Sequence, residues 1–326
     1  MTDSFSKDSL ILDAAAETER IVKAIRAAAR RFKRRGAIVA LSGGIDSSVV
    51  GALCVKALGP KRVFGLSLPE QESSTATPGL SDTLIQHLGI ESATVNLTPI
   101  LESFGCYETR IEAVREVIPE FTAEWKFKIV LPPVTESDSY RVFSVVAQSP
   151  EGRDVTQTLT LAAYLKILAA TNYKQRTRKA LEYFHADRLN YFVAGTPNLL
   201  EYDQGFFVKL GDGAADIKPI SHLYKTQVYQ LADYLGVPAA ISSRPPTTDT
   251  YSLPQSQEEF YFSLPYDKMD LCLFALKNDI AAEATAPVVG LTPEQVERVY
   301  DDIRAKRAVA DYLHAPPQTV DDCLAF

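Results

Sequence analysis

The chain has 326 residues, of which 46% are hydrophobic, and a formal net charge of −7. This length and composition indicate a soluble globular protein with a sizeable core, built as one α/β unit with an insertion or one domain with a small appendage. The acidic balance argues against a broad nucleic-acid-binding surface, and the four widely spaced cysteines exclude a metal or redox site of the CxxC type.

The N-terminus, MTDSFSKDSL, has no apolar core of the kind found in signal peptides. No uninterrupted apolar stretch of the sequence is long enough to span a bilayer. We therefore expect a cytoplasmic protein that does not act at a membrane.

The first hundred residues alternate between helical periodicity and short apolar runs. The expected elements, in chain order, are a helix over 13–35, a strand over 37–41, a helix over 46–58, a strand over 62–68, a helix over 80–88 and a strand over 93–97. This alternation is typical of a parallel sheet with crossover helices. We predict an α/β fold, a doubly wound, Rossmann-like parallel sheet with helices on both faces, whose ligands bind at the carboxyl ends of the strands.

The pattern breaks down between about 102 and 160. Strand-like runs at 127–134, 141–147 and 154–161, separated by proline-rich turns, predict a small inserted antiparallel element. Beyond it we expect, in order, a helix over 159–184, a strand over 191–195, a helix over 224–235 and a long loop over 244–265.

The sharpest local signal is a glycine turn between the first predicted strand and the helix that follows it. The turn reads Leu41-Ser42-Gly43-Gly44-Ile45-Asp46-Ser47-Ser48. Two glycines allow a tight bend whose N–H groups converge, and the helix N-terminus adds a partial positive charge, so the turn suits a phosphate. Asp46 can help to hold a divalent cation against phosphate oxygens. An ordinary strand-to-helix turn with an N-cap remains the alternative.

The turn lacks both the GxxxxGK[ST] and the GxGxxG patterns, which argues against γ-phosphate transfer and against a dinucleotide-binding turn. Instead, SGGIDS after a first parallel strand resembles the PP-loop of the ATP pyrophosphatase superfamily. Those enzymes cleave ATP between its α- and β-phosphates, adenylate an oxygen and release pyrophosphate. The superfamily includes NAD, GMP and asparagine synthetases and tRNA-thiolating enzymes, so it leaves the acceptor open.

The second half of the chain resembles one branch, the NAD synthetase family, over several segments in the same order. These are Asn172 with QRTR at 175–178, GTPNLLE at 195–201, GFFVKLGDGAAD at 205–216, PISHLYKTQV at 219–228, LGVP at 235–238 and PPTTD at 245–249. The resemblance covers most of the chain outside the predicted insertion. It departs at Ala305, where the family has a histidine before the Lys-Arg pair.

The resemblance implies a role for each matching residue. ATP would contact the turn (Leu41, Ser42, Gly43, Gly44, Ile45, Asp46, Ser47 and Ser48) and also Thr196, Lys225 and Thr247. Asp46 and Lys225 would be the catalytic residues, Asp46 and Glu201 would bind Mg²⁺, and Arg176, Lys209, Asp216 and Lys306 would bind deamido-NAD. Taken singly, Glu201 is also explained as a helix-start acid and Lys225 as a surface charge.

The expected reaction is the ATP-dependent amidation of deamido-NAD to NAD by ammonia, through an acyl-adenylate. We expect one NAD synthetase-like domain over 1–326, without a glutaminase domain, and the family resemblance implies a homodimer. An amidoligase of the same family that acts on another carboxylate is the main alternative. A tRNA-thiolating enzyme and a non-catalytic nucleotide-binding module are further alternatives, the former disfavoured by the acidic charge.

Overall fold

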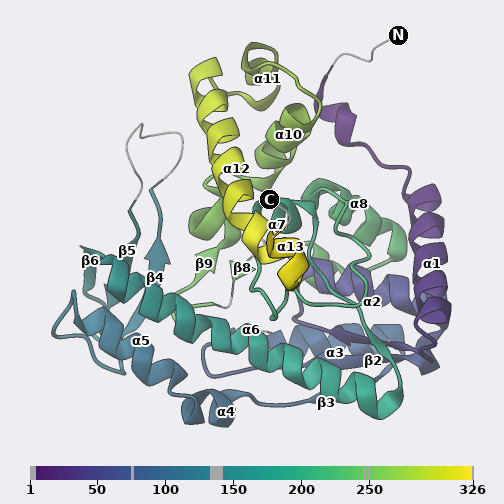
Figure 1. Ribbon diagram of the computed structural model, residues 1–326, viewed down its shortest axis with the longest axis horizontal. Helices are drawn as coiled ribbons and strands as arrows, with labels where there is room; N and C mark the ends of the chain where they lie inside the picture. The colour runs from purple at the N-terminus through teal and green to yellow at the C-terminus, as the bar shows by residue number, and fades with distance from the viewer. Residues whose placement is uncertain (1–4, 75–76, 133–141, 245–246, 249, 325–326) are drawn as a thin grey trace.

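The computed structural model describes residues 5–74, 77–132, 142–244, 247–248 and 250–324 (Figure 1). A short 3-10 helix, Lys7–Leu10, precedes helix α1, Ala14–Arg31. Asp13 begins α1 as its N-cap, because its side chain accepts the N–H of Ala16 at 3.0 Å.

The central sheet of the described residues has four parallel strands in the order β3-β2-β1-β7. The strands are β1 (Ala37–Ala40), β2 (Val63–Ser67), β3 (Glu91–Thr94) and β7 (Phe192–Val193). Chain order therefore runs outward from β1 to β3 and then returns to the other side of β1. This reversal between β1 and β7 is the topological switch point, where ligands bind in open α/β sheets.

Helices cover both faces of the sheet, because side chains alternate along β1. Ala37 and Val39 pack on one face and Ile38 on the other, all three fully buried. One face carries α1, α2 (Ile45–Leu58), α3 (Thr77–Leu88) and α8 (Lys225–Leu235). The opposite face carries α4 (Thr98–Ser103), α5 (Cys106–Arg115) and α6 (Leu161–Leu189). The predicted doubly wound α/β fold is confirmed.

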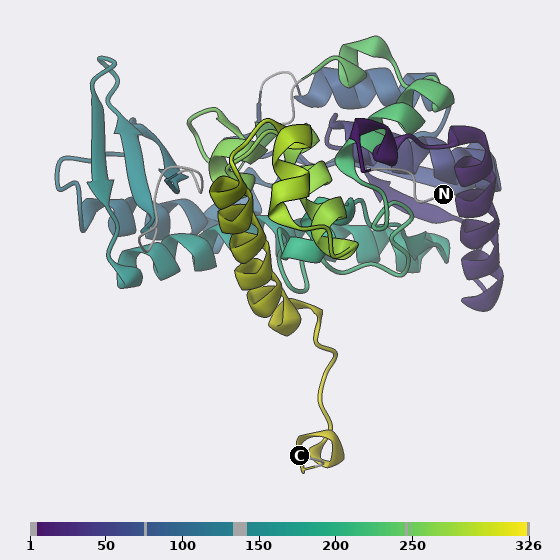
Figure 2. The same ribbon diagram turned by 90° about the horizontal axis from the view of Figure 1, so that it is seen from above.

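A second, antiparallel sheet stands beside the central one (Figure 2). Its strands are β4 (Lys126–Val130), β5 (Ser144–Gln148) and β6 (Asp154–Thr158), in that spatial order. Phe127, Ile129 and Val145 point into a core shared with α5 and the first turns of α6. Residues 133–141, where two of the predicted strands meet, lie outside the described residues.

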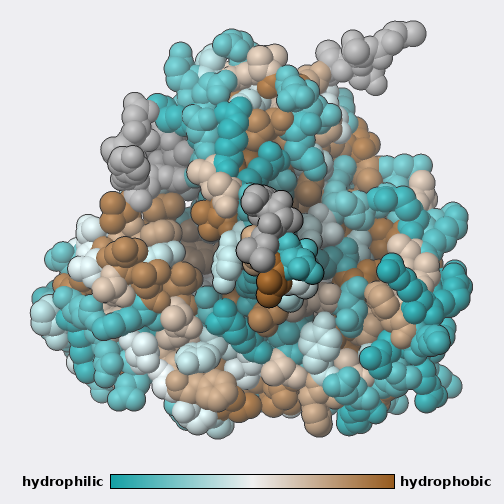
Figure 3. All heavy atoms as spheres, viewed as in Figure 1, coloured by the Kyte–Doolittle hydropathy of each residue, from teal (hydrophilic) through white to brown (hydrophobic). Residues whose placement is uncertain are grey.

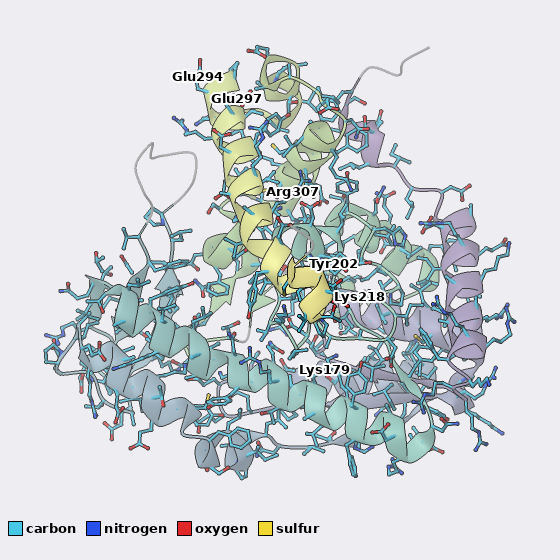
Figure 4. The ribbon with its side chains drawn as sticks, viewed as in Figure 1. Lys179, Tyr202, Lys218, Glu294, Glu297 and Arg307 are labelled. Carbon is cyan, nitrogen blue, oxygen red and sulfur yellow. The ribbon has the colours of Figure 1, made fainter. Side chains whose placement is uncertain are left out.

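The chain beyond β7 adds a separate helical core. It contains α7 (Leu199–Gln204), α10 (Tyr266–Lys277), α11 (Ala282–Val289) and α12 (Pro293–His314). Arg307 on α12 (Figure 4) binds Asp203 on α7 through two hydrogen bonds of 2.8 and 3.0 Å. The last helix, α13 (Val320–Leu324), lies at the end of an extended segment that leaves the body of the molecule (Figure 2).

Three sequence predictions need correction. Helix α5 lies where we expected no regular helix, and α6 runs five residues past its predicted end. The segment predicted as a long loop over 244–265 contains a strand pair, β8 (Thr247–Thr248) with β9 (Gln255–Ser256), and a π-helical turn, Glu258–Phe262. The short helix α9, Ala239–Ser242, precedes this segment.

An apolar stripe lies exposed along the amino-terminal half of α6. Leu161, Leu165 and Leu168 are spaced by four and three residues, so they share one face of the helix, and their exposed fractions are 72%, 50% and 36%. Figure 3 shows the hydrophobic surface gathered over this part of α6. Within the described chain, no helix has the length and apolar character needed to cross a bilayer.

Candidate active site

A cavity of about 460 Å³ opens at the carboxyl ends of β1 and β7. The switch point of the sheet therefore contains a cavity large enough for a small-molecule ligand, as the topology predicts. Ten of the predicted site residues line it: Leu41, Ser42, Gly43, Gly44, Ile45, Asp46, Ser47, Thr196, Glu201 and Lys225.

The glycine turn has the backbone geometry that its sequence predicts. Gly43 has a φ of 73°, and a Cβ at this position would lie 2.8 Å from the Cβ of Leu80, so only glycine fits. Gly44 is the N-cap of α2 and provides no side-chain acceptor for the first turn of the helix. The N–H groups of that turn therefore remain available to an anion in the cavity.

Serine hydroxyls fix the shape of the turn. The hydroxyls of Ser47 and Ser48 both donate to the carbonyl of Gly44, at 3.0 and 2.8 Å. The backbone N–H of Ser42 donates to the oxygen of Ser47 at 3.3 Å. Ser48 is fully buried and does not line the cavity, so its contribution is to hold the turn.

The ammonium group of Lys225 contacts the glycine turn. It begins α8 and is 2% exposed, and its Nζ lies 2.5 Å from Oδ2 of Asp46. Asp270 on α10 fixes the start of α8, because its carboxylate accepts the N–H groups of Lys225 and Thr226 at 3.1 and 2.7 Å. Burial alone would lower the pKa of Lys225, but the charges of Asp46 and Glu201 outweigh it and raise that pKa. The lysine is therefore a fixed cation at the floor of the cavity.

A capping box at the start of α7 positions the second carboxylate, that of Glu201, at the same site. The side chain of Asn198 accepts the N–H of Glu201 at 3.2 Å, and the carboxylate of Glu201 accepts the N–H of Asn198 at 3.1 Å. The amide of Asn198 also donates to Oδ1 of Asp46 at 3.0 Å, and that of Gln257 donates to Glu201 at 3.1 Å. One asparagine therefore joins the glycine turn to the start of α7.

Glu201 is an unusual acid. Burial, and next the negative charge of Asp46, raise the pKa of Glu201 to about 8. The negative charge of Asp46 disfavours ionisation of Glu201, and the charge of Lys225 opposes this effect, so a further cation would stabilise the site. The arrangement can bind a polyphosphate with its counter-ion and neutralise charge on a leaving phosphate.

Comparison with known proteins identifies the family of the chain. The family model for NAD synthase matches residues 17–118 and 144–309. An NH3-dependent NAD(+) synthetase of Mesorhizobium japonicum is 55% identical over 309 residues, which cover 94% of this chain and 97% of that protein. The chain belongs to the NAD synthase family. An NH3-dependent NAD(+) synthetase of Thermotoga maritima is 36% identical over 86% of this chain and 92% of that protein.

Solved structures share the fold of this NAD synthase family member at lower identity. The NMN synthetase of Francisella tularensis superposes with a TM-score of 0.64 at 22% identity, over 95% of this chain and 99% of that one. The NH3-dependent NAD synthetase of Campylobacter jejuni superposes with a TM-score of 0.61, also at 22% identity, over 95% of this chain and all of the other. These likenesses establish the architecture.

Four residues that the NAD synthase family pattern assigns to deamido-NAD do not line the cavity. Arg176 is exposed on α6 and donates to the carbonyl of Lys209 at 3.3 Å. Lys209 in turn donates to carbonyls at the end of α12, at 2.6 and 3.1 Å. Asp216 accepts the N–H of Val193 at 2.7 Å, and Lys306 pairs with Asp302 at 2.7 Å.

These four residues divide into two groups. The first pair, Arg176 with Lys209, joins α6 to the end of α12. Of the others, Asp216 binds the backbone of β7, and Lys306 forms an ion pair within α12. For Thr247, the backbone belongs to β8, but its side chain lies outside the described residues.

Several residues that build the site of this NAD synthase family member were assigned no role from the sequence. A signal for Asn198 was present, since Asn-Leu-Leu-Glu is a capping-box pattern. Lys179 and Glu182 form a buried ion pair of 2.7 Å on the cavity wall, one helical turn apart on α6. Lys179 is labelled in Figure 4. Asp270 carried no local signal, because its partners are 44 and 45 residues away.

Proposed function

We propose that the protein amidates deamido-NAD to NAD, using ATP to adenylate the carboxylate and ammonia as the nitrogen donor. The observation that carries the proposal is the contact between Lys225 and Asp46 at the glycine turn, in a chain 55% identical to an NH3-dependent NAD(+) synthetase. Of the alternatives, a non-catalytic module would have no need for this buried charge arrangement.

In the first step, a carboxylate oxygen of the substrate attacks the α-phosphorus of ATP. The bond from that phosphorus to the bridging oxygen breaks, and pyrophosphate leaves. The N–H groups at the start of α2 and the ammonium of Lys225 hold the phosphates and offset the developing charge. Thr196, on the cavity wall, and Thr247 are proposed as hydroxyl contacts to ATP.

In the second step, the nitrogen of ammonia attacks the acyl carbon, AMP leaves with its electron pair, and the nitrogen loses a proton. Rate enhancement comes from orientation and fixed charges, without a covalent enzyme intermediate.

Asp46 and Glu201 are the residues proposed to hold Mg²⁺. Their chemistry fits the ion, because Mg²⁺ is usually bound by one or two carboxylates and completes its shell with phosphate oxygens and water. The raised pKa of Glu201 supports this role, since a cation between the two acids would relieve their repulsion. A bound Mg²⁺ would supply charge neutralisation at the phosphates.

We assign deamido-NAD to Arg176, Lys209, Asp216 and Lys306, with a homodimer completing its site. The exposed leucine stripe of α6 supports the dimer, because an apolar face of this kind is usually covered in a stable protein. Arg176 lies on the same helix, about two turns beyond Leu168. A cytoplasmic location is supported by three buried free thiols, Cys54, Cys106 and Cys272.

The test is a coupled assay of pyrophosphate release and amide formation, with ammonia and a panel of acids that includes deamido-NAD and the acid form of NMN. We expect deamido-NAD to be converted fastest, with one AMP released per amide. A preference for another acid would favour the rival amidoligase. Formation of ADP and orthophosphate would refute the adenylation step itself.

A further inference from the structure

The segment 250–262 forms one wall of the cavity. Thr250, Tyr251, Gln257, Phe260 and Tyr261 all line it. The amide of Gln257 donates to the carboxylate of Glu201, so a small movement of this segment would change the surroundings of a proposed metal ligand. What fixes the segment therefore matters for the reaction.

The inserted sheet holds the segment from outside the cavity. In the order β4-β5-β6, strand β4 is an edge strand, and its outer backbone groups need partners. The segment supplies them. The N–H of Phe127 donates to Oγ of Ser252 at 2.9 Å, the N–H of Leu253 donates to the carbonyl of Phe127 at 3.1 Å, and the amide of Gln255 donates to the carbonyl of Ile129 at 2.7 Å.

A buried ion cluster holds the start of the segment. The cluster consists of Lys174 on α6, Arg110 on α5, and Glu70 and Glu72 in the turn after β2. Nζ of Lys174 lies 3.0 Å from Glu70, 2.5 Å from Glu72 and 3.1 Å from the carbonyl of Thr250. Arg110 binds Glu72 and donates to the same carbonyl at 3.3 Å.

The cluster also joins the segment to the inserted sheet. The guanidinium of Arg110 lies over the rings of Phe127 and Tyr251, at 4.8 and 5.2 Å, so it is held between β4 and the segment. Lys174 and Arg110 are each 1% exposed. A carbonyl that accepts from two buried cations is firmly placed, because both cations are withdrawn from bulk solvent.

We propose that the inserted sheet and the ion cluster position the 250–262 segment on the cavity, with Lys174 and Arg110 as positioning residues. This inference rests on the proposed function for its effect on catalysis. The inference also explains what strand β4 contributes. The NAD synthase family model leaves residues 119–143 unmatched, and β4, which binds the segment, lies within this unmatched range. The wall of the cavity is therefore held in part by residues that the family model leaves unmatched.

The first test removes the two side-chain contacts between segment and sheet without changing a residue that lines the cavity. The double variant Ser252→Ala with Gln255→Leu suits this purpose, because neither side chain lines the cavity. We expect amide hydrogen exchange in a peptide covering 250–262 to become about tenfold faster or more. We also expect kcat/KM for deamido-NAD to fall by about tenfold or more, since small misplacements are costly in catalysis. The fluorescence of Trp125, the single tryptophan, should stay unchanged and so report an intact insertion.

The second test addresses the ion cluster with Lys174→Met, and Lys166→Met is its matched control. Lys166 lies on the same helix and pairs with Glu116 at 2.5 Å on the surface. Lys174→Met should accelerate exchange in 250–262 and lower kcat/KM, and Lys166→Met should change neither. If Lys174→Met fails to fold, the double variant Ser252→Ala with Gln255→Leu still tests whether the inserted sheet positions the segment.

Two results would overturn the inference: unchanged exchange in 250–262 in the double variant, or faster exchange with unaltered kcat/KM. Wild-type protein that makes no NAD would refute the proposed function alone. Hydrogen exchange is measured without turnover, so it judges the positioning of the segment independently.

Discussion

Nζ of Lys225 and Oδ2 of Asp46 lie 2.5 Å apart, so the cation and the acid that flank the glycine turn neutralise each other. An entering polyphosphate must share this lysine with Asp46, and a metal ion on Asp46 would release it. Under the proposed function, the pair holds an ammonium ready for the phosphates of ATP, at a position where water has little access.

Lys225→Met should lower kcat for pyrophosphate release by about 10²-fold or more, because a fixed cation is lost from a buried site. Asp46 would also lose its partner, so thermal stability should fall. The double variant Asp46→Asn with Lys225→Met should regain stability but no activity. Lys56→Met, on the exposed side of α2, is the control and should behave as wild type. Near-normal turnover by Lys225→Met would remove the lysine from the mechanism.

Asn198→Ala should lose both an N-cap and the bond that orients Asp46. We expect the free energy of unfolding to drop by about 1 kcal/mol, as for other N-cap losses. Thr292→Ala is a matched control, because Thr292 forms the capping box of α12 and does not line the cavity. Denaturant titration should give similar losses for the two variants, and only Asn198→Ala should reduce kcat. Equal activities would show that Asn198 acts only as a cap.

The stability of the metal-free protein should decline as the pH rises from about 5 to about 8. Glu201 has a pKa raised to about 8 by burial and the charge of Asp46, and burial raises that of Asp270 to about 7. An acid whose pKa is higher in the folded chain binds its proton more tightly there. Its stabilising effect is full below the unfolded pKa and is lost as the pH passes the folded value.

Glu201→Gln should flatten this decline, because the amide does not titrate. Urea titrations at several pH values, with chelator present, would measure it. Asp267→Asn, which replaces an exposed acid on α10, should leave the slope as it is in wild type. A Glu201→Gln profile parallel to that of wild type would contradict the assignment.

Arg176→Ala should raise the KM for deamido-NAD by about tenfold and leave the KM for ATP unchanged, since one charge-assisted contact to a phosphate is lost. Initial-rate kinetics with each substrate varied in turn would separate the two constants. The control is Arg188→Ala, an exposed arginine farther along α6. An equal rise in both KM values would instead indicate a disturbed cavity.

Leu165→Glu should convert a dimer to monomers, because it places a charge within the exposed stripe of α6. Sedimentation velocity would measure the change in mass. Val309→Glu, at a position 67% exposed on α12, is the matched control and should keep the wild-type mass. A wild-type protein that sediments as a monomer at micromolar concentration would refute the homodimer.

Local signals predicted the central sheet and the glycine turn well. The apolar run at β1 and the two glycines after it depend on neighbours within a few residues, so the sequence pattern contains the information. Lys225 and Glu201 were identified by family resemblance, whereas the contact between Lys225 and Asp46 spans 179 residues and has no local pattern.

The 250–262 segment could not be predicted for a different physical reason. Its polar residues and prolines indicate a loop, but its backbone is ordered by partners on β4, about 125 residues earlier in the chain. Helix α5 was missed because its periodic apolar positions are few, and it is stabilised by packing against α6 and the inserted sheet.

The contacts along helix α6 restrict where insertions and deletions can be accepted in evolution. Along its 29 residues it presents the leucine stripe, then Lys174 to the ion cluster, and then Lys179 and Glu182 to the cavity. Adding or deleting one residue in its middle would rotate everything beyond by about 100° and turn these side chains away from their partners. Length variation among descendants of this chain should therefore be confined to the two ends of α6, at Thr160 and Asn190, while its middle changes by substitution alone.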